Sequence, residues 1–214
     1  ILVTNVVAAT IPNWQVPVDK ASILLIGNKF EYTGEPVEPV AYIFVGGVCL
    51  KQDRDYDIYF FNNNSVGTGY ILIVGKDNYC GYKWYSFDIT VSGNTIAQYA
   101  SSKGFLGIPY IYGGTTKNGF DCSGFVQYVY KQFGITLNRT ASEQSNQGIY
   151  VDKENLAPGD LVFFSSFNHV GIYVGDNMFV HASNRGVVLT SLIDDEEVGT
   201  YYATRYCGAR RIVT

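Results

Sequence analysis

The residues of this chain that could carry covalent chemistry are a cysteine and two histidines in its second half. Cys122 is followed by His169 and His181, and the chain has no other histidine. A thiol, an imidazole that accepts its proton and a polar group that orients this imidazole are the minimum set for a cysteine nucleophile. The three residues therefore indicate nucleophilic catalysis.

Cys122 lies where a helix is predicted to begin. Apolar residues recur at helical spacing over Asp121–Phe133, and Gly134 follows as a C-terminal signal. The free N–H groups at a helix N-terminus favour thiolate over thiol, and Asp121 and Ser123 can cap the same turn. The alternative is a buried, inert cysteine that serves as a small hydrophobic residue.

The two histidines are expected on one hairpin, with strands at His169–Val174 and Met178–His181. A three-residue loop, Gly175–Asn177, would pair Gly171 with His181 and place both imidazoles on one face. A two-residue loop at Asp176-Asn177 would place them on opposite faces. Alternatively, each histidine is a strand residue bonded to a backbone carbonyl.

The cysteines do not predict a metal site. Cys49, Cys80, Cys122 and Cys207 form no CxxC pair, and the two histidines lack a fourth ligand at a recognisable spacing. We therefore expect no metal and no cofactor. A chain of 214 residues does not need a disulfide scaffold, and a Cys49–Cys80 bridge is left open.

The spacing of apolar runs divides the chain into a β half, residues 1–92, and an α+β half, residues 93–214. In the first half, short runs alternate with turn signals about 8–12 residues apart, which is typical of a β-sandwich. Its expected strands are Ser22–Ile26, Val40–Val45, Tyr56–Phe61, Gly69–Val74 and Trp84–Ile89.

The second half begins after the junction Val91-Ser92-Gly93-Asn94 with a short helix capped by Thr95. Strands follow the predicted cysteine helix. They are expected at Leu161–Phe164, Val170–Val174, Met178–His181, Val187–Leu189 and Tyr201–Val213.

Charge and hydropathy exclude several partners. The net charge is −4, so the chain lacks the cationic excess that nucleic-acid binding requires. Its longest apolar run, Ala41–Leu50, is too short to span a membrane. The chain opens at Ile1 without a basic and apolar leader, so we interpret it as a processed form or a fragment. We expect a monomer.

The first half resembles the immunoglobulin-like modules of Gram-positive surface proteins over about Ser22–Thr90. The matching segments are Tyr32-Thr33-Gly34, Leu50, Asp55-Tyr56, Asn62-Asn63, Val66-Gly67-Thr68, Gly75-Lys76-Asp77-Asn78-Tyr79 and Gly81. The resemblance implies a spacer or a wall-adhesive module. Residues Ile1–Lys20 would complete this sandwich or end a preceding repeat.

The second half resembles the NlpC-type cell-wall peptidases. The motifs occur in order as Pro109-Tyr110-Ile111-Tyr112-Gly113-Gly114, Asp121-Cys122-Ser123-Gly124, Leu137-Asn138-Arg139-Thr140 with Gln144, Pro158–Phe164, His169–Tyr173 and His181-Ala182. The resemblance implies a papain-like α+β fold and a secreted or wall-associated cysteine endopeptidase. Such enzymes cleave peptidoglycan stem peptides, typically between γ-D-glutamate and the diamino acid.

The resemblance also implies residue roles. Cys122 would form a thioester, His169 would act as base and then acid, and His181 would orient His169. Tyr110 would hydrogen-bond near the thiol or the oxyanion. Tyr112 stands where tryptophan is frequent in the family, which affects the details of substrate binding.

Four further residues are candidates to contact the substrate. Asp121 and Ser123, which flank the nucleophile, would contact it. Arg139 and Arg185 are candidates to bind stem-peptide carboxylates, and the alternative is that both are solvated surface cations. Two other functions remain open: amidase or acyltransferase chemistry on the same fold, and a non-catalytic wall-binding protein.

Overall fold

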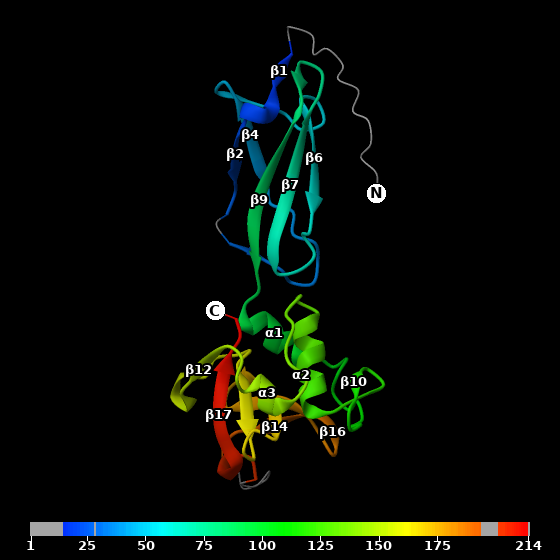
Figure 1. Cartoon of the computed structure of the whole chain (residues 1–214), viewed down its shortest axis with the longest axis vertical. Helices are drawn as coiled ribbons and strands as arrows, with labels where there is room; N and C mark the ends of the chain where they lie inside the picture. The colour runs from blue at the N-terminus through cyan, green and yellow to red at the C-terminus, as the bar shows by residue number, and fades with distance from the viewer. Residues whose placement is uncertain (1–14, 28, 194–200, 214) are drawn as a thin grey trace. The chain divides into compact units, whose positions relative to one another are not determined.

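The computed structural model describes residues 15–27, 29–193 and 201–213 (Figure 1). Its contacts form two compact units, one of Ile1–Phe30 with Glu35–Ile89 and one of Glu31–Gly34 with Thr90–Thr214. Residues 1–20 were predicted to complete the sandwich or to end a preceding repeat, and of these residues 1–14 lie outside the described part of the chain.

The first unit is built from strands, as its turn-rich sequence predicts. One sheet has the order β2 (Ser22–Leu25), β4 (Ala41–Val45), β5 (Val48–Cys49), and the other has the order β3 (Phe30–Glu31), β9 (Tyr82–Thr90), β7 (Gly67–Gly75), β6 (Tyr56–Phe61). The pairs β2–β4, β4–β5, β6–β7 and β7–β9 are antiparallel. Alternation along β7 and β9 buries Ile71, Ile73 and Phe87 on one face. The five strands predicted for this half are confirmed, with ends that differ by one or two residues.

Two short elements complete the described part of this unit. Strand β1 (Val16–Pro17) pairs in parallel with β8 (Tyr79–Cys80), and a 3₁₀ turn, η1, covers Val18–Lys20. All four cysteines of the chain are free thiols. The Cys49–Cys80 bridge that the sequence left open is therefore not formed.

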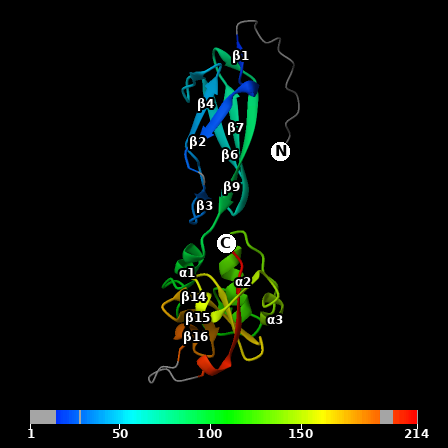
Figure 2. The same cartoon turned by 90° about the vertical axis from the view of Figure 1, so that its left-hand side faces the viewer.

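The second unit is centred on a six-stranded antiparallel sheet (Figure 2). Its order is β12 (Ile149–Val151), β17 (Tyr206–Arg211), β13 (Leu161–Phe164), β14 (His169–Gly175), β15 (Met178–Ser183), β16 (Gly186–Ser191). Strand β12 was not predicted, because three residues carry too little alternation to be recognised. Strand β17 is shorter than the expected Tyr201–Val213, since a 3₁₀ turn, η3 (Ala203–Arg205), precedes it.

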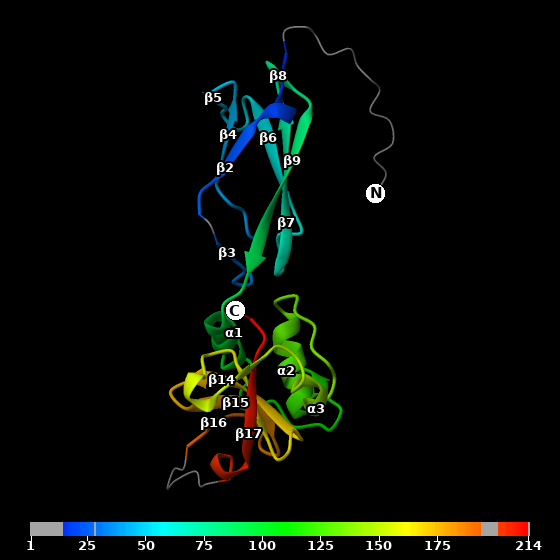
Figure 3. The ribbon, with the colours of Figure 1, turned by 60° about the vertical axis from the view of Figure 1, so that its left-hand side comes forward.

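Two helices cover one face of this sheet (Figure 3). Helix α2 (Cys122–Lys131) packs on β14 and β15, and α1 (Gly93–Ala100) contacts β14 and α2. The predicted N-cap of α1 was wrong: Ser92, not Thr95, is the cap, because its hydroxyl accepts the Thr95 N–H at 3.2 Å. Helix α2 ends before the predicted Phe133, although Gly134 has the expected positive φ of 78°.

Short elements and an ion pair complete the second unit. Helix α3 (Ala141–Gln144) has a capping box, and the 3₁₀ turn η2 covers Lys153–Asn155. Buried Asp160 binds the Arg211 guanidinium through two contacts of 2.8 Å. A short hairpin of β10 (Thr115–Thr116) and β11 (Gly119–Phe120) precedes α2. Within the described part of the chain, no helix is both long and apolar enough to cross a bilayer.

Candidate active site

Cys122 is the first residue of α2 and is 8% exposed. Asp121 caps the helix, since its carboxylate accepts the Gly124 N–H at 2.7 Å. Gly124 is required for close packing: a Cβ there would lie 2.1 Å from the Gly114 carbonyl oxygen. The first turn of α2 is thus held against the chain segment that leads into it.

An ion pair fixes the same turn from the other side. Arg139 donates to Asp121 Oδ1 at 3.0 Å and to Ser123 Oγ at 2.9 Å, and it also pairs with Asp121 Oδ2. The Gly113 N–H donates to the same carboxylate at 2.9 Å. Burial by itself would raise the pKa of Asp121, but the bonds from Arg139 and from the Gly124 and Gly113 N–H groups hold it below its usual value.

This network corrects one sequence interpretation. Arg139 is not a free surface cation, because Asp121 neutralises it. Asp121, Ser123 and Arg139 do line a hollow together with Cys122, so contact with a substrate remains a prediction for them. Their bonds to one another give them a structural role that the sequence did not reveal.

The hairpin β14–β15 brings the two histidines together through a two-residue turn and a bulge. Asp176 and Asn177 form a two-residue turn with φ of 51° and 55°, and Gly175 pairs with Met178. A register shift between Tyr173 and Gly175 adds one residue, and Tyr173 pairs with Phe179. Of the two loops that the sequence left open, the structure has the two-residue one; the expectation that it would put the imidazoles on opposite faces was wrong, because the bulge gives the register of the three-residue loop.

The consequence is a direct imidazole pair. His169 Nε2 lies 2.8 Å from His181 Nδ1, and His181 Nε2 lies 3.0 Å from Thr190 Oγ1. Because its Nε2 is occupied, His169 keeps Nδ1 for a thiol. If His181 donates its Nε2–H to Thr190, its Nδ1 accepts from His169, and His169 Nδ1 is then an unprotonated base.

Room for the pair comes from the residue opposite His181. A Cβ at Gly171 would lie 2.6 Å from the Phe179 ring and 3.1 Å from the His181 Cβ. Aromatic rings enclose the imidazoles: Phe179 stacks on His181 at 4.7 Å, and Tyr202 lies 4.8 Å from His181 and 5.8 Å from His169. His181 is completely buried.

This enclosure sets the charge of both imidazoles. Burial lowers the pKa of His169, and burial, followed by the nearness of His169 and Arg185, lowers the pKa of His181. Both rings are therefore neutral at pH 7, the state in which His169 can accept a proton.

The thiol behaves differently from the sequence expectation. Burial raises the pKa of Cys122, and the backbone N–H groups of Val170 and Ser123 offset only part of this rise. The helix N-terminus therefore does not produce a resting thiolate here, because desolvation outweighs it. The resting pair is a neutral thiol and a neutral imidazole.

Two hollows meet at Tyr110. The cysteine hollow contains Cys122, and the histidine hollow, of about 540 Å³, contains His169; Tyr110 lines both. Burial raises the pKa of Tyr110, and the nearness of Cys122 adds to the rise. Cys122 and His169 thus line two hollows that share Tyr110, and His181 is buried in contact with His169.

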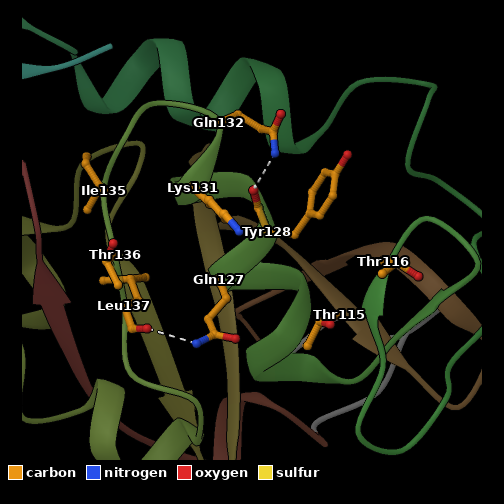
Figure 4. A pocket seen from close by; sticks show the side chains of 9 residues that line it. All are labelled: Thr115, Thr116, Gln127, Tyr128, Lys131, Gln132, Ile135, Thr136 and Leu137. Carbon is orange, nitrogen blue, oxygen red and sulfur yellow. Dashed lines mark hydrogen bonds between the residues drawn. The ribbon is translucent and has the colours of Figure 1, made fainter.

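A third hollow lies on another side of α2 and has a different lining. This threonine hollow, of about 560 Å³, is shown in Figure 4. It is lined by Thr115, Thr116, Gln127, Tyr128, Lys131, Gln132, Ile135, Thr136 and Leu137. None of these is a histidine, cysteine or carboxylate, so the threonine hollow lacks the thiol and the imidazole of the predicted site. Elsewhere in the described residues, no group of three metal-ligating side chains occurs.

Sequence reasoning missed two residues of the site. Thr190 is 3% exposed and bonds His181, while Tyr202 covers both imidazoles and lines the histidine hollow. Thr190 comes from β16 and Tyr202 from the segment before β17. Only alternation along β16 could have indicated Thr190, and no local signal distinguishes Tyr202 from the other tyrosines.

A helix that begins with cysteine, packed on an antiparallel sheet that carries a histidine pair, defines a papain-like domain. Residues 107–211 match the NlpC/P60 family. The chain belongs to the NlpC/P60 family.

The chain is similar to known proteins both in sequence and in structure. The chain is 43% identical over 132 residues to the murein DD-endopeptidase MepS/murein LD-carboxypeptidase of Escherichia coli K12, covering 59% of this chain and 66% of that protein. It is 44% identical over 117 residues to the γ-D-glutamyl-L-lysine dipeptidyl-peptidase of Bacillus cereus, covering 52% of this chain and 34% of that protein. The structure of NlpC1 from Trichomonas vaginalis superimposes with a TM-score of 0.52 at 27% identity, covering 78% of this chain and 62% of that one.

Proposed function

We propose that the chain is a cysteine endopeptidase that hydrolyses peptidoglycan stem peptides at the bond between γ-D-glutamate and the diamino acid. The observation that carries the proposal is the 2.8 Å contact of His169 with His181 beside a cysteine at a helix start. The activities named for the Escherichia coli and Bacillus cereus relatives support the substrate class, and the second name supports the bond.

Acylation follows from the neutral resting pair. As the Cys122 sulfur attacks the peptide carbonyl, its proton moves to Nδ1 of His169, and the carbonyl oxygen becomes an oxyanion. The Cys122 backbone N–H at the helix start is a candidate donor to this oxyanion, worth about 3 kcal/mol. His169 then protonates the leaving amine, the C–N bond breaks, and a thioester remains.

Deacylation reverses the proton path. His169, again neutral, removes a proton from water while the water oxygen attacks the thioester carbonyl. The C–S bond breaks, and the proton returns from His169 to the sulfur as the acid product leaves. His181 holds the His169 ring through both steps and spreads its transient positive charge.

The cleft rim suits a small amphipathic peptide. Tyr112 is 91% exposed beside Cys122, and Tyr110 lies between the two hollows. Arg185 lines the histidine hollow, and it has no ion-pair partner among the described residues. We assign it to a carboxylate of the stem peptide.

The remaining parts of the proposal concern the first unit and the location. We propose that residues 1–92 form an immunoglobulin-like module that serves as a spacer or wall-binding part, and that residues 93–214 form the peptidase. The proposed location is secreted or wall-associated, in a bacterium of Gram-positive type, and the proposed state is a monomer. The two sheets of the first unit support the module.

Mass spectrometry of digested muropeptides tests the reaction. We expect products with a new free amine on the diamino acid, and none from the Cys122→Ala variant. A released lactyl-sugar or a transferred acyl group would indicate an amidase or acyltransferase instead. Cleavage only at the D,D cross-link would show that the enzyme hydrolyses that bond and not the proposed one. No product from any fragment would indicate a non-catalytic wall-binding protein.

A further inference from the structure

Five aromatic side chains project from one sheet of the first unit. We call Tyr59, Phe61, Tyr70, Tyr82 and Trp84 the aromatic face. Their exposed fractions are 49%, 43%, 38%, 63% and 49%. They come from β6, β7 and β9, which lie side by side (Figure 1).

Strand register puts all five on the same side of the sheet. Phe61 pairs with Tyr70, and Trp84 pairs with Leu72, which in turn pairs with Tyr59. Because side chains alternate, the intervening residues point to the other side, where Ile71, Ile73 and Phe87 are buried.

The central rings touch one another. The Trp84 ring lies 5.2 Å from Phe61 and 6.5 Å from Tyr70, measured between ring centroids. The Trp84 ring therefore extends from β9 over β7 toward β6. Phe61, Tyr70 and Trp84 thus form a central cluster, and strand register places Tyr59 and Tyr82 on the same side of the sheet.

The size of this surface argues against a second copy of the chain. Aromatic side chains bury about 150–250 Å² each, so five that are about half exposed offer about 500 Å². A stable protein interface needs about 800 Å² from each partner. A narrow ligand fits the area better.

The charges on this side of the sheet restrict the class of ligand further. The outward positions of β6, β7 and β9 include no lysine or arginine; their charged residues are Asp57, which pairs with Lys76 at 2.9 Å, and Asp88. A phosphate-bearing polymer or an anionic membrane would find no cation at these positions. Flat apolar rings edged by phenol and indole groups instead match an uncharged sugar, which has a C–H face and a hydroxyl rim.

We propose that the aromatic face binds an uncharged, β-linked N-acetylhexosamine glycan by stacking sugar rings on Trp84 and its neighbours. The choice of this glycan rests on the proposed function, because stem peptides are attached to such a backbone. The face would hold the chain on the glycan while the second unit cuts peptides.

Calorimetric titration with N-acetylchitohexaose tests the proposal on the full chain carrying Cys122→Ala. Trp84→Ala is expected to weaken binding at least about tenfold, and Tyr82→Ala by about threefold to tenfold. Tyr42→Ala is the matched control: this tyrosine is 46% exposed but lies on β4, in the other sheet, and we expect no change. Tryptophan fluorescence gives a second measurement of binding. Since the chain has two tryptophans, Trp14 and Trp84, the titration is done with a Trp14→Phe variant, so that the fluorescence change comes from Trp84 alone.

Three results would overturn the proposal: no binding of the oligosaccharide, equal binding by Trp84→Ala, or a dimer in sedimentation that Trp84→Ala abolishes. If Trp84→Ala fails to fold by circular dichroism, Tyr82→Ala decides. Cleavage of a soluble stem peptide, measured with Cys122 present, separates the two proposals. Trp84→Ala should leave this cleavage unchanged, and its absence in the wild type would remove the proposed function without affecting the measured glycan binding.

Discussion

The histidine hollow and the threonine hollow lie in the same unit and differ little in size, about 540 and 560 Å³. The first contains the exposed edge of a buried imidazole pair, and the second is lined by hydroxyls, amides and one lysine (Figure 4). Volume therefore does not locate the chemistry. What distinguishes the two is the convergence of desolvated titratable groups from separate elements.

The largest expected effect is the loss of the nucleophile. Cys122→Ala should lower kcat/KM for a stem peptide by at least about 10³-fold, because no other group can form the thioester. Cys207→Ala, which removes an exposed thiol, is the matched control and should retain full activity. Comparable losses in both variants would place the chemistry elsewhere.

The imidazole pair should show a graded loss. His169→Ala removes the base and should lower kcat by about 10²–10⁴-fold. His181→Ala should cost less, about 10–10²-fold, because one hydrogen bond to a charged ring is worth about 1.5–3 kcal/mol. Steady-state kinetics on folded variants test the ranking, and equal losses would contradict it.

Cations in the two hollows offer a direct comparison. Arg185→Ala should raise KM about threefold to tenfold with little change in kcat, since it removes an exposed partner of a substrate carboxylate. Lys131→Ala, in the threonine hollow, should change neither parameter. An effect of Lys131 equal to that of Arg185 would erase the distinction between the hollows.

The smallest effect concerns stability and pH. Both histidines have lowered pKa values when folded, whereas an unfolded histidine titrates near pH 6.5. Below about pH 6.5 the unfolded chain therefore binds more protons than the folded chain. The free energy of unfolding consequently falls with decreasing pH, by up to about 1.4 kcal/mol per pH unit for each buried histidine. Urea unfolding at pH 7.5 and 5.5 measures the loss of unfolding free energy between the two pH values. This loss should be smaller for His181→Asn than for the wild type, and a larger loss in the variant would contradict the prediction.

Much of the site could be predicted from local patterns. Helical spacing after Asp121 placed Cys122 at a helix start, and alternating strands around Gly175–Asn177 placed both histidines on one hairpin. The turn itself was left open between two loops, and the bulge was not foreseen; a bulge and a two-residue loop give the same register as a three-residue loop. Sequence alternation records the face of a residue but not the route by which the chain turns.

Local signals along the chain were sufficient to assign the elements that carry the thiol and the imidazoles, since capping and periodicity act within a few residues. The tertiary structure decided that Thr190 and Tyr202 complete the histidine pair and that Arg139 neutralises Asp121. It also reversed the expected pKa shift of Cys122. The physical reason is that desolvation and ion pairing depend on residues far away along the chain, which only packing brings into contact.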